Sequence, residues 1–160
     1  MRKTKMAIDN IKPDNCPLNR ATIKQLLPHR DPILLVDRVI SFSDENIITE
    51  LNSSDHNNLF NGHFPDRAIL PGIYMIEMAA QSGALLVGLN DSIDDDRFIG
   101  FAGVDNVKFK RPVQPDEILR AHVEIVKRRG PLYKFKGRVT VNDNLTVSLE
   151  FTASLMKYSG

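Results

Sequence analysis

The sequence predicts an α+β domain in which one antiparallel sheet packs against one long helix. Two observations support this prediction. Residues 68–89 are apolar on almost every side, which is typical of a buried helix. The last third of the chain alternates apolar and polar side chains, the period of strands with one solvated face. A chain of 160 residues is long enough for one such domain and needs no disulfides to hold its core.

Local patterns give the order of the predicted elements. Residues 1–20 mix charge, Asn and Pro without periodicity and predict a loose leader, so that 21–160 form the single domain. A short helix is predicted at 21–27, because Pro28 disfavours its continuation. Residues 52–61 are polar and predict a loop. Strands are predicted at 33–42, 46–51, 107–110, 119–127, 133–141 and 145–155, and the turn formers 142–144 join the last two as a hairpin.

The long apolar segment is expected to be a core helix that begins at Leu70-Pro71-Gly72. Pro71 suits the first helical turn, where a missing N–H is no loss. The segment is long enough to span a bilayer, but Glu77 lies within it and a carboxylate at that depth is costly. We therefore expect a soluble, cytoplasmic protein. The acidic run at 90–97 predicts a solvated surface loop, because no paired ligands accompany it.

Composition argues against several classes of protein. The formal net charge of +1 lacks the basic excess of a protein whose main partner is nucleic acid. Cys16 is the only cysteine, so no internal disulfide forms and a reducing compartment fits. The basic start is followed by no apolar stretch, so no signal peptide is predicted. The four histidines lack the spacing of metal ligands, so no metal site is expected.

His63 and Glu77 are the candidate acid–base pair. His63 lies in a turn-prone stretch among apolar side chains, just ahead of the long helix, and Glu77 lies inside that helix. We expect burial to favour the protonated form of this carboxyl group. A histidine and a partly protonated carboxylic acid supply the two halves of acid–base chemistry. Structural roles stay open, since the same residues could be a helix-capping histidine and a salt-bridged core glutamate.

The other polar residues have simpler interpretations. His56 lies in the predicted polar loop and His122 on the polar face of a predicted strand, so both are expected to be surface histidines. Asp37 and Arg38 are neighbours that could pair locally.

Several motifs resemble those of the FabZ-type 3-hydroxyacyl-[acyl-carrier-protein] dehydratases. They occur in that family's order and together span roughly residues 21–157, which makes the resemblance specific although no single motif would suffice. The motifs are LPHRDPILLVDR at 27–38, NGHFP at 61–65, LPG at 70–72, EMAAQSG at 77–83, FAGVD at 101–105 and KFKRPV at 108–113.

The resemblance implies a hot-dog fold, in which a curved antiparallel sheet wraps around one central helix. It implies homodimers, commonly assembled as trimers of dimers, with each active site at a dimer interface. The substrate would be an acyl chain bound as a thioester to acyl carrier protein, in fatty-acid biosynthesis and lipid metabolism. The reaction would be a hydro-lyase dehydration that needs no cofactor, because the thioester itself acidifies C2.

The family's site residues carry over to three positions of this chain. The resemblance makes His63 the catalytic histidine, Glu77 the catalytic carboxyl group from the other subunit, and Gly72 the backbone N–H donor to the thioester carbonyl. A helix N-terminus is a place where developing negative charge is stabilised, which fits the role of Gly72. In relatives the segment around His29 looks structural.

Some positions depart from the family pattern. The family usually has Tyr in place of Asp31, Gly-His-Pro in place of Asp66-Arg67-Ala68, and an aromatic side chain in place of Gly100. Such positions lie near the acyl tunnel or its entrance in relatives. The departures leave open the acyl chain length, and whether the pathway is housekeeping fatty-acid synthesis or a specialised polyene or secondary lipid pathway. Glu77, where FabA-type isomerising relatives usually carry Asp, favours simple dehydration.

Basic side chains are candidates for docking acidic carrier protein, since charge complementarity raises the association rate. A solvated strand face is the alternative interpretation of the same residues. The candidates are Lys108, Lys110, Arg111, Arg128 and Arg129.

Other functions remain as alternatives. A hot-dog acyl thioesterase would hydrolyse the thioester with a carboxylate-activated water, and a non-catalytic acyl-thioester sensor would bind the chain without turnover. The combination of His63 with Glu77 and Gly72 argues against the thioesterase. Known sensors of this kind carry an appended DNA-binding domain, and the short leader at 1–20 shows no helix-turn-helix pattern.

Overall fold

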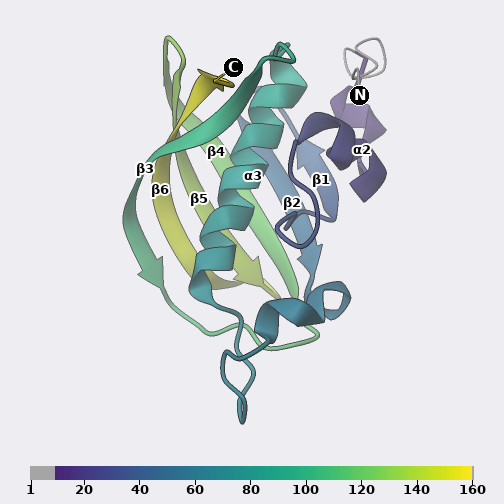
Figure 1. Cartoon of the computed structure of the whole chain (residues 1–160), viewed down its shortest axis with the longest axis vertical. Coiled ribbons are helices and arrows are strands. Elements are labelled where there is room, and N and C mark those ends of the chain that lie inside the picture. The colour runs from purple at the N-terminus through teal and green to yellow at the C-terminus, as the bar shows by residue number, and fades with distance from the viewer. Residues whose placement is uncertain (1–9, 160) are drawn as a thin grey trace.

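The computed structural model of the chain describes residues 10–159 (Figure 1). Among the described residues, two short helices, two strands and a third short helix precede one long helix, and four strands follow it. In chain order they are η1 (Pro13–Asn15), α2 (Arg20–Leu26), β1 (Arg38–Phe42), β2 (Asn46–Asn52), η2 (Ser53–Phe60), α3 (Gly72–Asn90), β3 (Arg97–Phe109), β4 (Ile118–Arg129), β5 (Leu132–Val141) and β6 (Asn144–Lys157).

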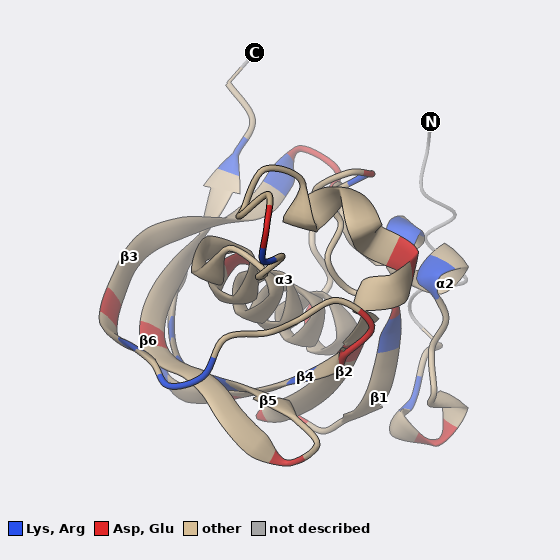
Figure 2. Ribbon diagram, turned by 90° about the horizontal axis from the view of Figure 1, so that it is seen from below, with Lys and Arg blue, Asp and Glu red and all other residues tan. Residues whose placement is uncertain are grey.

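Six strands form one antiparallel sheet in the order β1-β2-β4-β5-β6-β3. The sheet curves around α3, which Figure 2 shows nearly end-on inside the curve. This is the hot-dog arrangement, and it confirms the predicted α+β fold. The predicted hairpin is also confirmed, because β5 and β6 pair directly and Asn142 and Asp143 adopt the positive φ angles that a tight two-residue turn requires.

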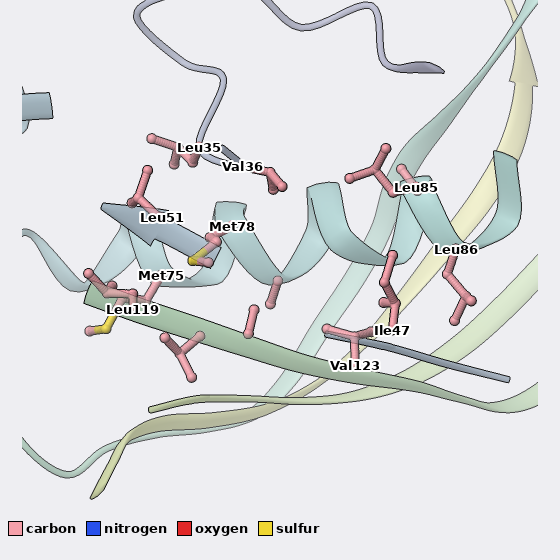
Figure 3. Packing of buried hydrophobic residues seen from close by; sticks show 14 of the residues in the cluster. Leu35, Val36, Ile47, Leu51, Met75, Met78, Leu85, Leu86, Leu119 and Val123 are labelled. Atoms are coloured by element: carbon pink, nitrogen blue, oxygen red, sulfur yellow. The ribbon is translucent and has the colours of Figure 1, made fainter. Parts of the chain in front are cut away.

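The core lies between α3 and the inner face of the sheet. Met78, Leu85 and Leu86 of α3 are fully buried, and each such side chain contributes about 1.5–3 kcal/mol of hydrophobic stabilisation. Figure 3 shows Leu119 and Val123 of β4 on one side of the helix and the loop that precedes β1 on the other. More than half of α3 is buried in this way, so its length and apolar character fit a core helix as well as a membrane span.

The segment before β1 differs from the prediction. Residues 33–37 were expected to continue the strand at 38–42, but they form an irregular segment with Leu34, Leu35 and Val36 fully buried. The amide of Gln81 replaces the missing strand partner, because its Oε1 accepts from Leu35 N at 2.8 Å and its Nε2 donates to Ile33 O at 2.7 Å. The branched apolar residues at 33–37 therefore indicate a buried segment, but they do not indicate a strand.

Two further predictions were wrong in extent. β3 spans 13 residues where only 107–110 were predicted, since its first part lacks a regular apolar alternation. The expected polar loop at 52–61 is largely the 3₁₀ segment η2, which buries Leu59, Phe60 and His56.

Residues 1–9 of the expected leader lie outside the described residues. Within the described part of the leader, Leu18 is buried and forms an isolated bridge with Val39. Asn19 caps α2 by accepting a hydrogen bond from Thr22 N at 3.0 Å. Arg20 then binds the carboxylates of Asp31 and Asp37, so that α2 is tied to the segment before β1.

The end of α3 is fixed by a contact that the acidic run did not predict. Most of residues 91–96 are exposed, as expected of a surface loop. Asp91, however, accepts a hydrogen bond from Tyr133 at 3.0 Å and forms an ion pair with Arg128 at 2.9 Å. These contacts anchor the helix C-terminus to β4 and β5.

Two glycines of α3 give a matched prediction for packing. A Cβ atom at Gly83 would lie 3.1 Å from the Phe151 ring, which is itself buried and stacked on Phe135, so the neighbours have little room to move. A Cβ atom at Gly88 would meet only Ile93, at 3.8 Å. We expect Gly83→Ala to lower the free energy of unfolding by about 1–3 kcal/mol. Gly88→Ala should raise it by about 0.5–1 kcal/mol, since alanine loses less backbone entropy.

Urea unfolding at one fixed protein concentration would measure both changes. A shift of the same sign and size for the two variants would contradict the packing argument.

Candidate functional site

His63 lies in the segment between η2 and α3, and hydrogen bonds hold it on several sides. Its backbone N–H donates to Phe60 O at 3.0 Å, and Ile69 N donates to His63 O at 2.8 Å. The ring Nδ1 lies 2.9 Å from Ile69 O. Because a carbonyl only accepts, Nδ1 carries the hydrogen, and in the neutral ring Nε2 is left as the acceptor. The imidazole is therefore oriented and poised to take a proton at Nε2.

Phe64 covers one face of that ring. The two rings stack with their centroids 4.2 Å apart, and the His63–Phe64 peptide bond is cis. Phe64 N and Arg67 N donate to each other's backbone carbonyls, which closes a tight tip at 64–67. Phe64 remains 55% exposed, so an apolar surface lies beside the histidine at the protein boundary.

Gly72 is the first residue of α3. The first N–H groups of a helix have no intrahelical acceptor, and Pro71, the N-cap residue, offers no side-chain cap. The Phe109 ring of β3 lies over Gly72 so closely that a Cβ atom there would be 2.5 Å from Phe109 Cε1. The N–H of Gly72 therefore lies at the positive end of the helix dipole, at a position where a side chain would displace Phe109.

Glu77 lies one and a half turns further along α3. Its Oε1 accepts a hydrogen bond from Gln81 Nε2 at 2.8 Å and lies 3.5 Å from Nε2 of His29. The side chain is 26% exposed, so it is less buried than the apolar sequence around it predicts. The sheet surrounds α3 incompletely, and Glu77 faces the segment at 27–34 instead of the inner face of the sheet.

One chain does not bring the predicted pair together. The contacts among residues 10–159 join His63 to Ile69 and Phe64, and join Glu77 to His29 and Gln81, but none joins His63 to Glu77.

The prediction of a surface role for His56 is wrong. Its side chain is buried, and Nε2 lies 2.9 Å from Asp37 Oδ1. The suggested pairing of Asp37 with Arg38 is also wrong, because Asp37 binds Arg20 and His56 while Arg38 pairs with Glu50. The sequence around Asp37 and His56 did not predict this cluster, because its members come from α2, η2 and the segment before β1. His122 does lie on the outer, polar face of β4, where it lines a groove with Lys136 and Arg138.

The basic candidates fall into two groups. Lys108, Lys110 and Arg111 lie where β3 ends, near the start of α3, and Arg111 pairs with Glu117 at 2.9 Å. Arg128 and Arg129 lie at the other end of α3, where Arg128 is held by Asp91 and by the Tyr133 ring. Within one chain the five side chains do not form one patch.

Within residues 10–159, no three His, Cys, Asp or Glu side chains are arranged to hold a metal ion.

Residues 27–150 match the FabA-like domain family. The chain is 41% identical to the 3-hydroxyacyl-[acyl-carrier-protein] dehydratase FabZ of Albidiferax ferrireducens, over 84% of this chain and 92% of the relative. It is 39% identical to the FabZ dehydratase of Bacillus cereus, over 86% of this chain and 96% of the relative. The chain belongs to the FabZ family.

Solved structures share the fold of this FabZ family member at much lower identity. The dehydratase heterocomplex ApeI:P from Xenorhabdus doucetiae has a TM-score of 0.75 at 19% identity, and covers 84% of this chain and 91% of that one. A hypothetical thioesterase with coenzyme A from Streptococcus pneumoniae has a TM-score of 0.60 at 13% identity, covering 76% and 87%. Both proteins support the hot-dog architecture alone.

The structure explains two of the departures from the FabZ pattern. Asp31 receives hydrogen bonds from Lys24 and Arg20, which hold the pKa of this exposed carboxyl group below its usual range and tie α2 to the following segment. At Gly100 a Cβ atom would lie 3.0 Å from Phe98 and 3.1 Å from Met156, whose side chains take the space beside the backbone. Asp66 and Arg67 are exposed at the tip beside His63.

The Asp37 cluster predicts a dependence of stability on pH. Burial raises the pKa of Asp37, but the hydrogen bonds from His56 and Asn52 N, together with the charges of His56 and Arg20, outweigh it, so the pKa lies below its usual range. A carboxyl group with a lowered folded-state pKa stabilises the fold above its unfolded-state pKa of about 3.9, and that contribution is lost as the pH falls through the folded-state value. We expect Asp37→Asn to cost about 1–3 kcal/mol at pH 7.

The gap between wild type and Asp37→Asn should therefore narrow below about pH 4. Unfolding curves from pH 7 to pH 3 would test this, with Asp66→Asn at the exposed tip as the control. A gap that stays constant with pH would show that the charge of Asp37 contributes nothing.

Proposed function

We propose that this protein dehydrates (3R)-3-hydroxyacyl-[acyl-carrier-protein] to trans-2-enoyl-[acyl-carrier-protein] in fatty-acid biosynthesis. Membership of the FabZ family supports this. The single observation that carries the chemistry is the hydrogen bond from Nδ1 of His63 to Ile69 O, because it leaves Nε2 as an oriented base. The proposal includes a cytoplasmic location, where fatty-acid precursors on carrier protein would be available.

The proposed steps use three groups. Nε2 of His63 removes a proton from C2, and the electron pair shifts toward the thioester oxygen. The N–H of Gly72 donates to that oxygen as its charge develops. The C3–O bond then breaks, Glu77 donates its proton to the leaving hydroxyl group, and water and the 2,3-double bond result. His63 ends protonated and Glu77 ends as a carboxylate, so proton exchange with water resets the pair.

We propose that the acting pair is formed between two copies of the chain. The lack of a contact between His63 and Glu77 within one chain supports this, since an acid and a base must reach the same substrate. β3 lies at the edge of the sheet with Phe101 and Val104 exposed, and a second copy could pair there. A homodimer, assembled further as a trimer of dimers, is the arrangement that we propose.

Carrier protein is the proposed partner. We assign the docking role to Lys108, Lys110 and Arg111, because they lie at the end of the molecule where α3 begins at Gly72. Arg128 and Arg129 lie at the other end of the helix in the same chain, where Arg128 binds Asp91 just after α3 ends.

Turnover tests the acid–base pair. Wild type should dehydrate 3-hydroxybutyryl- or 3-hydroxydecanoyl-thioesters on carrier protein, measured as enoyl absorbance. His63→Ala and Glu77→Gln should each lower kcat about 10²–10⁴-fold, since each removes one half of the acid–base chemistry.

Glu124→Gln, on the exposed outer face of β4, is the matched control and should leave kcat unchanged. A wild-type protein that releases free thiol from an unhydroxylated acyl thioester, without dehydration, would instead be a thioesterase. Binding of the hydroxyacyl chain without any turnover would favour a sensor.

Charge reversal tests the proposed docking surface. Replacing Lys108 and Lys110 together by Glu should raise KM for the carrier-bound substrate about tenfold, because like charges slow association with an acidic partner. KM for the same acyl chain on a short CoA-like thioester should not change. The double replacement of Arg128 and Arg129 by Glu is the comparison, and a larger effect there would transfer the docking surface to the other end of α3.

A further inference from the structure

His29 lies against the carboxyl group of Glu77, although the proposed steps do not use it. It follows α2, and its ring reaches toward α3 with Nε2 3.5 Å from Oε1 of Glu77. This separation is longer than a formed N–H···O hydrogen bond. Such contacts around a reacting group are often long in a protein without substrate and tighten in the complex.

Oε1 of Glu77 therefore has two donor groups beside it, one from His29 and one from Gln81. Gln81 Nε2 donates to Oε1 at 2.8 Å, and the same amide group donates to Ile33 O and accepts from Leu35 N. Since these bonds fix the Gln81 amide, its hydrogen bond to Oε1 also fixes the carboxyl plane. Among the residues that the structure describes, no contact involves Oε2 of Glu77.

The environment of His29 selects one form of its ring. Nδ1 is buried and lacks a hydrogen-bond partner within the described part of the chain. A buried N–H without an acceptor costs more than a bare ring nitrogen, so the favoured form is neutral with its hydrogen on Nε2. Burial lowers the pKa of His29, the charge of Glu77 raises it, and the neighbouring Arg30 lowers it. These two side chains are the charged groups that act on the ring.

From this arrangement we infer that His29 is a positioning residue that acts with Gln81 to hold Oε1 of Glu77 and to leave Oε2 as the proton-donating oxygen. The inference rests on the proposed dehydration. A carboxylic acid accepts hydrogen bonds best at its carbonyl oxygen, so two donors at Oε1 place the acidic hydrogen on Oε2. When Oε2–H gives its proton to the leaving hydroxyl group, the carboxylate that remains is stabilised at Oε1 by the same two donors.

The ring of His29 can be observed without any turnover. Nitrogen-15 NMR of the histidine rings in wild type should show His29 neutral, with its hydrogen on Nε2, through the pH range from 8 to below about 6.5. The ionised form of Glu77, which remains after proton donation, raises the pKa of His29. Glu77→Gln cannot form that carboxylate, so the midpoint of the His29 titration should move to still lower pH. A hydrogen on Nδ1, or a His29 titration that Glu77→Gln leaves unchanged, would overturn the inference whether or not the enzyme turns over.

Kinetics then test the role in the reaction. His29→Ala should lower kcat about tenfold with KM nearly unchanged, as expected when one hydrogen bond to a charged group is lost. His29→Gln keeps a side-chain N–H donor of similar reach and should recover most of the rate, without the titration of an imidazole.

His122→Ala is the matched control, because burial lowers the pKa of His122 as well but the residue lies on the outer face of the sheet. Equal kcat for wild type and His29→Ala, or a His29→Gln variant that folds like wild type but is no faster than His29→Ala, would overturn the inference. Wild type without dehydratase activity would instead contradict the proposed function, while the NMR titration would still decide whether His29 and Glu77 are coupled.

Discussion

The amide of Gln81 is the interaction on which the rest of the structure depends. The segment before β1 buries three consecutive apolar side chains without entering the sheet, so its backbone polar groups need other partners. Gln81 supplies them from the middle of α3, with bonds to Ile33 O and Leu35 N, and its remaining donor reaches Glu77. One fully buried side chain thus couples the packing of the helix to the orientation of a reactive carboxyl group. Each of these buried bonds would cost about 1–3 kcal/mol to leave unmade.

Regular patterns of the sequence predicted the regular parts of the fold. The continuous apolar run of α3 and the strict alternation of β4, β5 and β6 are direct consequences of burial on all sides or on one side. The first part of β3 was missed, because an edge strand whose faces are both partly exposed needs no alternation. The first half of the strand predicted at 33–42 is irregular for a different reason. Its apolar residues indicate burial only, and the Gln81 side chain of α3 binds the backbone groups that a neighbouring strand would otherwise bind.

The candidate site was predictable in its residue types and not in its geometry. His63 and Glu77 stood out as titratable groups beside or within an apolar segment, and the family resemblance gave them roles together with Gly72. Sequence could not show that Ile69 O fixes the His63 ring, because that contact depends on the path of the segment between η2 and α3. It also could not separate the basic residues at the two ends of α3, since their distance apart is set by the sheet. His56 and Asp37 were misplaced for the same reason, as their contact is tertiary.

The position of β3 links assembly to solubility. It is the longer of the two edge strands in the described sheet: 13 residues that pair with β6 on one side only, with two shifts of register and with apolar side chains exposed along it. A long apolar edge with free N–H and C=O groups is a template onto which any extended chain can add. In the proposed dimer, the second copy that covers this edge would therefore also protect the protein against aggregation, a protection that newly made chains lack before they find a partner.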